Sequence, residues 1–329
     1  MRKSFFNRQK DLHRLIFIII IACLALGAGF VVKKHLTSVK EEVHNESSEE
    51  LLYDGTSEAF TNETSEEVAE EYYEEPSDDP VSIEPNEEVI KAMESGDPEK
   101  IDAAVLSQYR ELNPDTKALI RIDGTVLNHP LMQSESNEGF YLNHDVLKNK
   151  NANGTPFMSL TSELLKGGCN AVIYGHNIHT ARKDVFEPLA GYESLSYYKD
   201  HPTIRIVTDQ GASDYLVIAY YLVDTADEDA FVYWEQTSWK EEKDFESYMS
   251  EVEKRNWLKT GIPYDIHDSF ITLSSCSLEL AHSGTNRMVV MARLIRATEK
   301  EEVISAYLEN AESNPAPFLP QKLRTDGEN

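Results

Sequence analysis

The chain has 329 residues and a formal net charge of −27, from 58 acidic and 31 basic side chains. Such an acidic chain lacks the basic face that general nucleic-acid binding requires, so we expect no nucleic-acid partner. The length suits one good-sized domain with appendages. The three cysteines, Cys23, Cys169 and Cys276, are too few for a disulfide scaffold. A disulfide between Cys169 and Cys276 is one alternative, but a free and buried Cys169 is favoured.

A basic segment and an apolar segment begin the chain. Residues 1–14 carry Arg and Lys side chains, and residues 15–32 are apolar without a charge, close to the roughly 20 residues that cross a bilayer. The basic flank predicts a cytoplasmic N-terminus. We therefore predict a signal anchor that crosses the cell membrane once and leaves the rest of the chain outside. A cleaved signal peptide is one alternative. A lipoprotein signal at Cys23 is another, but the apolar run continues past that cysteine.

An acidic segment follows, from residue 33 to residue 86. Between Glu41 and Ile90 there is no Lys or Arg, and Glu, Ser and Thr are frequent. Like charges repel and little apolar surface is available for burial, so we predict a disordered stalk. Apolar residues then recur at helical spacing on both sides of a break at Gly96–Pro98. This spacing predicts two helices between Glu87 and Leu112.

Short β-branched and apolar runs, separated by Gly, Asn, Asp and Pro, predict a mainly β domain folded as a barrel or sandwich. A helix at Asp244–Leu258 interrupts the strands, and we expect its apolar stripe to pack on the core. Residues 297–329 are expected to be a charged tail with a short helix at Glu301–Asn310. The predicted strands are Ala118–Ile122, Val126–Met132, Thr155–Ser159, Ala171–Tyr174, Thr203–Thr208, Tyr215–Val223, Phe270–Cys276 and Met288–Ile295.

Three of these strands place reactive side chains at their ends. One strand ends at Cys276, the next begins beside Arg287, and an earlier strand ends at Tyr174, just before His176. The thiolate is the nucleophilic form of cysteine, and His176 is suited to accept its proton and later to protonate a leaving amine. Arg287 stays charged and is suited to hold a carbonyl or an oxyanion with its planar donors. The pattern predicts a catalytic site made of Cys276, His176 and Arg287.

The motifs around these residues resemble those of a known family. Tyr174–Asn177 (YGHN), Thr272–Cys276 (TLSSC) and Arg287–Val290 (RMVV) occur in the order found in class B sortases. The resemblance covers about Leu112 to Leu294. Ser275 stands where that family commonly has Thr, and it keeps the hydroxyl. The resemblance implies a sortase-type closed β-barrel with N-terminal helices and an inserted helix before the cysteine strand.

The resemblance and the composition together divide the chain into five parts. The expected parts are a cytoplasmic basic segment (1–14), a transmembrane signal anchor (15–32), an acidic disordered stalk (33–86), a sortase catalytic domain with N-terminal helices (87–296) and a charged C-terminal tail (297–329).

The resemblance also implies an activity, that of a membrane-anchored cysteine transpeptidase of Gram-positive bacteria. Such an enzyme cleaves the C-terminal sorting signal of a secreted protein through a thioacyl intermediate. It then passes that protein to an amine of a peptidoglycan precursor or of a pilin. A cysteine hydrolase on the same scaffold and a catalytically inactive surface protein are the alternatives, and the intact Cys276, His176 and Arg287 argue against the second.

Other residues are candidates for substrate binding and for support of the site. Ser274 and Ser275 precede the nucleophile and are expected to line the substrate groove, and by resemblance Leu142 is expected in an apolar pocket wall. The sequence contains no metal-ligand spacing, so we expect no metal and no other cofactor. A third, acidic catalytic residue has three candidates, Asp184, Asp224 and Glu279. Spacing in the sequence singles out none of them.

Overall fold

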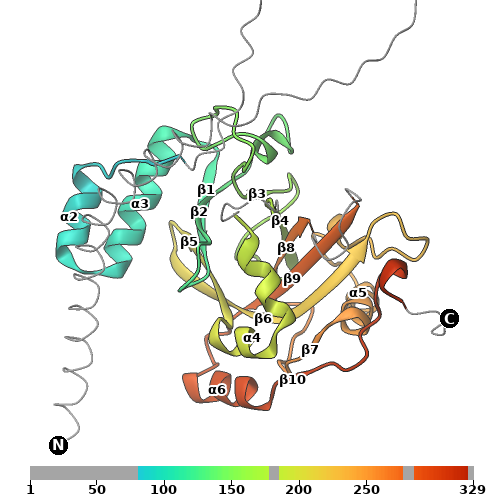
Figure 1. The fold of residues 1–329 in the computed structure, drawn as a ribbon. Helices are drawn as coiled ribbons and strands as arrows, with labels where there is room; N and C mark the ends of the chain where they lie inside the picture. The colour runs from blue at the N-terminus through green and yellow to red at the C-terminus, as the bar shows by residue number, and fades with distance from the viewer. Residues whose placement is uncertain (1–80, 178–184, 277–284, 325–329) are drawn as a thin grey trace, which may run out of the picture. The chain divides into compact units, whose positions relative to one another are not determined.

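Eight strands of the described chain close into a barrel in the order β1-β2-β3-β4-β8-β9-β6-β5 (Figure 1). The computed structural model describes residues 81–177, 185–276 and 285–324. Neighbouring strands are antiparallel, except for the parallel pairs β2–β3 and β4–β8. The closed barrel that the resemblance implied is therefore confirmed. The strands are β1 Thr116–Arg121, β2 Asn128–Met132, β3 Phe157–Met158, β4 Cys169–Tyr174, β5 Thr203–Thr208, β6 Gly211–Asp224, β8 Ser269–Cys276 and β9 Asn286–Leu294.

The predicted membrane segment, residues 15–32, and the predicted stalk up to residue 80 lie outside the described residues. Within residues 81–324, apart from the two gaps, the structure contains no helix with the length and apolar character needed to cross a membrane.

Two helices precede the barrel, as the sequence predicted. They are α2 (Glu87–Ser95) and α3 (Pro98–Leu112), which lie side by side, with α3 next to β1 and β5 (Figure 1). Gly96 ends α2 in the left-handed conformation, with φ of +64°, which glycine adopts without steric cost. The Asp97 side chain then caps α3 by accepting a hydrogen bond from the Glu99 amide. The break at Gly96–Pro98 therefore follows from residues that end one helix and start the next.

The folded part of the chain begins earlier than the predicted boundary at residue 87. Val81 and Ile83 pack against the buried cluster that contains Tyr141. The Gln108 side chain on α3 donates a hydrogen bond to the Glu84 carbonyl at 2.7 Å. The apolar residues at the end of the acidic segment are thus part of the domain.

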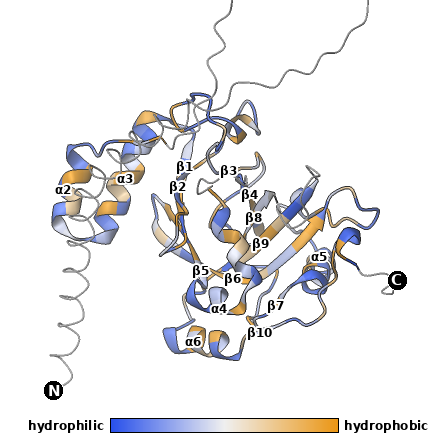
Figure 2. Cartoon of the chain, in the orientation of Figure 1, coloured by the Kyte–Doolittle hydropathy of each residue, from blue (hydrophilic) through white to orange (hydrophobic). Residues whose placement is uncertain are grey.

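The barrel core uses one face of every barrel strand, including Ile271 and Leu273 of β8 and Val290 of β9. Phe270 and Val289 lie on the opposite face, in a second cluster with residues of α5 (Glu242–Arg255). Alternate residues of a strand point to opposite faces of the sheet. In β6, β8 and β9 both sets of residues are apolar, because the barrel core covers one face and the cluster with α5 covers the other. Figure 2 shows hydrophobic stretches along β6 and β9.

The inserted helix packs as expected but ends earlier. The predicted apolar stripe of α5, which includes Phe245 and Val252, is buried on the outer face of the sheet. The helix ends at Arg255 instead of Leu258. Asn256 leaves the helix to bind β6 just after the irregularity between Val217 and Ala219, where its side chain accepts from the Tyr220 amide at 3.0 Å. A contact between segments far apart in the sequence therefore decides this boundary.

The C-terminal segment is more ordered than a charged tail. Its helix α6 (Glu301–Asn310) has the predicted bounds. Beyond it, β10 (Glu312–Ser313) pairs with β7 (Leu258–Lys259), and the chain continues along the domain as far as residue 324. Short elements without a sequence signal also occur. They are η1 Phe140–Leu142, η2 Glu187–Glu193, α4 Leu195–Asp200, η3 Tyr233–Glu235 and η4 Gln321–Leu323.

Candidate active site

The three candidate catalytic residues lie at the same end of three adjacent strands. Cys276 and Arg287 are directly opposite each other in the antiparallel pair β8–β9. Tyr174 is opposite Ser274 in the parallel pair β4–β8. The chain continues from Tyr174 through Gly175 to His176, and the Gly175 amide still donates to the Ser274 carbonyl at 3.3 Å. The segment with the histidine therefore runs beside the cysteine strand, as expected for neighbouring strand ends.

Packing around Gly175 holds the backbone of His176. A Cβ atom at Gly175 would lie 2.8 Å from the nearest carbon of the Phe186 ring, so only glycine fits there without a shift. The amide of Phe186 donates to the His176 carbonyl at 2.9 Å. Phe186 is fully buried in the barrel core. Because Gly175 has no side chain, the buried Phe186 can pack against it and hydrogen-bond to the backbone of the partly exposed His176.

Ser274 and Ser275 are both buried, and both hydroxyls have partners inside the protein. The Ser275 hydroxyl donates to the Gly175 carbonyl at 2.8 Å, which connects the cysteine strand to the histidine segment. This bond explains why a hydroxyl is kept at a position where the family commonly has Thr, because either residue supplies the donor. The Ser274 hydroxyl lies 2.6 Å from the Tyr233 hydroxyl. A contact of either serine with substrate stays a prediction.

Tyr174 and Tyr233 both feel the charge of Arg287. Arg287 is partly buried and donates from Nη1 to the Asn286 carbonyl at 2.8 Å. Burial raises the pKa of Tyr174 to about 12, the Glu138 charge adds to this, and the charge of Arg287 opposes it. Burial likewise raises the pKa of Tyr233, against the hydrogen bond to Ser274 and the charge of Arg287. Both phenols are therefore neutral at physiological pH and keep their hydrogen-bond donors.

Sequence reasoning missed Tyr233. Its signal was present as the aromatic run Phe231–Trp234 between β6 and α5, but nothing in the sequence connects this run with the cysteine strand. Only the fold brings the Tyr233 hydroxyl to Ser274.

Comparison with known proteins finds relatives among the class B sortases. No family model matches the chain. Sortase B of Staphylococcus aureus is 28% identical over 189 residues, which are 57% of this chain and 73% of that protein. Sortase B of Listeria monocytogenes is 28% identical over 192 residues, 58% of this chain and 74% of that protein. Among solved structures, the Staphylococcus aureus sortase B–substrate complex has a TM-score of 0.54 at 25% identity, covering 64% of this chain and 93% of that one. The chain is thus similar to class B sortases in both sequence and fold.

Through these sortase B relatives, the protein is assigned as a cysteine transpeptidase of the sortase type. The resemblance that the three motifs indicated is thereby confirmed, and so is the enzyme class that it implied.

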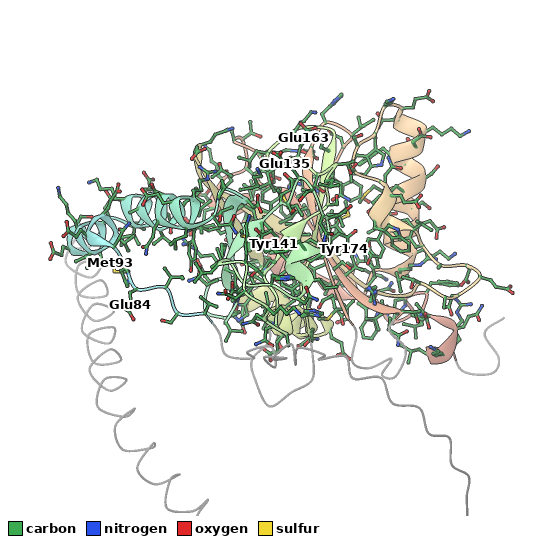
Figure 3. All side chains as sticks on the ribbon, turned by 90° about the horizontal axis from the view of Figure 1, so that it is seen from above. Glu84, Met93, Glu135, Tyr141, Glu163 and Tyr174 are labelled. Carbon is green, nitrogen blue, oxygen red and sulfur yellow. The ribbon has the colours of Figure 1, made fainter. Side chains whose placement is uncertain are left out.

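The predicted pocket residue Leu142 ends η1 and is 44% exposed. Its neighbour Tyr141 is buried in a cluster against which Tyr174 packs. Figure 3 shows the labelled Tyr141 and Tyr174 in the central part of the molecule. Phe157 is in the same cluster and its ring centroid lies 5.4 Å from that of Tyr174. Leu142 is therefore an exposed apolar side chain next to the cluster at the end of β4, and its role as a pocket wall stays a prediction.

Of the three candidates for an acidic catalytic residue, Asp224 lies in the described part of the chain. Asp184 and Glu279 lie outside the described residues. Asp224 follows Val223, the partner of Arg287 in β6–β9, and its carboxylate lies 2.8 Å from the Lys322 ammonium group. Burial works against ionisation of this carboxyl group, but hydrogen bonds from Lys322 and Thr285 outweigh it and lower the pKa. These partners assign Asp224 to a structural ion pair.

Cys169 is free and buried, as favoured from the sequence. It lies opposite Ser269 in β4–β8. Cys276 is at the other end of β8, about 23 Å further along at the usual rise of a strand. Disulfides require Cα atoms within about 7 Å, so this geometry excludes the Cys169–Cys276 pair. Burial raises the pKa of the Cys169 thiol, which keeps it protonated.

The residues that the structure describes contain no group of three or more His, Cys, Asp and Glu side chains placed to hold a metal ion.

Proposed function

We propose that this sortase cleaves the C-terminal sorting signal of secreted proteins and transfers the acyl fragment to an amine. The observation that supports this function best is the juxtaposition at one sheet end. Cys276 and Arg287 are cross-strand partners, and the His176 segment runs beside the same strand. A nucleophile, a proton carrier and a fixed cation are the groups that acyl transfer through a thioester requires.

The proposed roles follow from the chemistry of each group. The Cys276 thiolate attacks the scissile carbonyl carbon, and the carbonyl electrons move onto its oxygen, where Arg287 stabilises the negative charge. The C–N bond then breaks, and His176 gives its proton to the departing amine. An incoming amine attacks the thioester, loses a proton to His176 and releases the thiolate. Cys276 is thus regenerated and His176 is protonated for the next cycle.

We also propose that residues 15–32 anchor the enzyme in the cell membrane with a cytoplasmic N-terminus. The basic flank and the uncharged apolar run support this topology. The acidic segment would then hold the domain away from the membrane, where a membrane-bound substrate and a peptidoglycan precursor or pilin lysine would be available. Protease treatment of intact protoplasts should release the catalytic domain. A domain that is protected in intact protoplasts would contradict the topology.

A peptide-library assay tests the reaction itself. Purified enzyme is incubated with peptides that carry varied candidate sorting signals, with and without an amine acceptor, and the products are identified by mass spectrometry. We expect cleavage at one bond and a new amide in the presence of the amine, with no turnover by Cys276→Ala. A free carboxylic acid as the only product at saturating amine would instead support a cysteine hydrolase.

A further inference from the structure

The first part of the connection between β6 and α5, residues 225–235, is here called the rim loop because the candidate site borders it on both sides. Just before it, Val223 of β6 is the cross-strand partner of Arg287. Near its end, the Tyr233 hydroxyl lies 2.6 Å from the Ser274 hydroxyl on the cysteine strand. The position of this loop therefore affects the space around the candidate site.

The rim loop also exposes apolar surface. Val232 is 42% exposed, although its neighbour Tyr233 is buried. An exposed valine beside the candidate site is suited to contact an extended peptide. Any such contact depends on the loop keeping its place.

Residues 314–324, here called the C-terminal strap, hold the first half of the rim loop and the β6 residue before it. Two of the three contacts join a cation of the strap to a carboxylate, and the third joins a backbone amide to a carboxylate. The contacts are Lys322 Nζ to Asp224 Oδ2, Gln321 N to Asp227 Oδ2 and Arg324 Nη2 to Asp229 Oδ2, each at 2.8 Å. The strap thus supplies positive charge to a loop that carries three acidic residues in its first five positions.

Phe318 connects the strap to α5 through a backbone hydrogen bond and a cation–π contact. Its amide donates to the Lys254 carbonyl at 2.9 Å. Its ring centroid lies 4.1 Å from Lys254 Nζ and 4.1 Å from the guanidinium carbon of Arg324. From α5 itself, Arg255 Nη2 donates to the Asp229 carbonyl at 3.0 Å. The helix, the strap and the rim loop are therefore joined at Asp229.

We propose that the C-terminal strap positions the rim loop for substrate binding, so that its residues are positioning residues of this sortase. This inference rests on the proposed function. The contacts named above reach the rim loop, the end of β6 and α5, and none of them involves His176 or Arg287. Loss of the strap should therefore weaken substrate binding and leave the chemical step almost unchanged.

Two truncations of the full-length chain test the proposal. One ends at Ala316 and removes the contacts of Phe318, Gln321, Lys322 and Arg324. The matched control ends at Arg324 and removes only the residues that follow. We expect the first to raise KM for the best-cleaved peptide about tenfold, from several weak charged contacts, with kcat within about twofold. The control should match the full-length enzyme in both constants.

A double-mutant cycle tests the acidic contact without removing a segment. Arg324→Ala and Asp229→Ala should each raise KM by about two- to fivefold, the range of a partly exposed ion pair. The double variant should be no worse than Arg324→Ala alone, because the ion pair with Asp229 is already lost in that variant. KM values within experimental error of the full-length enzyme in the Ala316 truncation, or a large fall in kcat at unchanged KM, would overturn the proposal.

Amide hydrogen exchange separates this inference from the reaction. In the Ala316 truncation, residues 224–235 should exchange about tenfold faster, while β4 and β8 keep their protection. If the full-length enzyme cleaves no peptide, the proposed function fails, and unchanged exchange in residues 224–235 then refutes the strap as well. If the enzyme is active and neither KM nor exchange changes, the strap inference alone is refuted.

Discussion

Gly175→Ala should damage this sortase through its core, although the substitution adds a single methyl group. The new Cβ would lie 2.8 to 2.9 Å from three carbons of the Phe186 ring, whereas carbon atoms in contact are normally about 3.5–4.0 Å apart. The ring is fully buried, so it has little room to move away. Overpacking of this kind costs about 1–3 kcal/mol of unfolding free energy.

The same substitution should affect catalysis more than stability. The Phe186 amide donates to the His176 carbonyl, so a displaced Phe186 also displaces the proposed proton carrier. A shift of about 1 Å in a catalytic group can lower the rate about a hundredfold. We therefore expect kcat/KM for the sorting peptide to fall by about that factor, while the midpoint of thermal unfolding falls by only about 3–9 °C.

Urea unfolding and peptide turnover of four variants measure both effects. Phe186→Leu replaces the flat ring by a shorter side chain that lacks Cε2 and can turn its methyl groups away from the new Cβ. Gly175→Ala should therefore cost less in its presence, with a coupling energy of about 1 kcal/mol or more. The matched control is Gly139→Ala, because a Cβ at Gly139 has nothing within 4 Å. That variant should keep its stability within about 0.5 kcal/mol and its full activity. Additive costs of Gly175→Ala and Phe186→Leu would refute the steric argument.

Three further predictions concern single side chains. Arg287→Lys keeps the charge but loses the planar pair of donors, so turnover should fall about a hundredfold while alkylation of the Cys276 thiol continues; near-normal turnover would contradict the oxyanion role. Ser275→Ala removes the bond to the Gly175 carbonyl and should cost about 1 kcal/mol in denaturant unfolding, whereas Ser275→Thr should keep most of it; equal losses would show that the hydroxyl is not needed. Burial lowers the pKa of His129 from 6.5 to about 4, so between these pH values the unfolded chain binds a proton that the folded protein does not. Stability should therefore fall by at most about 3 kcal/mol as the pH drops through this window, and His129→Gln should lose that part of the pH dependence in unfolding curves measured from pH 7 to pH 4.

The sequence by itself indicated the candidate catalytic residues and determined most of the elements that carry them. Strand ends at Cys276 and Tyr174 were visible because β-branched runs stop there at polar or glycine-containing segments. The helix at Glu301–Asn310 was predicted with its observed bounds, and the apolar stripe of α5 was buried as predicted. These features depend on local propensity and periodicity, which are encoded in neighbouring residues.

Only the tertiary structure decided how those elements support one another. The early end of α5 depends on Asn256, which binds the backbone of β6 more than thirty residues earlier in the chain. The hydroxyl of Ser275 donates to the Gly175 carbonyl, a contact between two strand ends that the sequence did not indicate.

The same limit applies to Tyr233 and to the C-terminal segment. The Tyr233 side chain meets Ser274, and residues 314–324 fold against a loop that precedes them by about ninety residues. Each of these contacts joins segments that are distant in the sequence, and no local pattern marks such a pair. Local patterns state which side chains are suited to a reaction, but closure of the barrel decides which of them meet, because it fixes the register between strands.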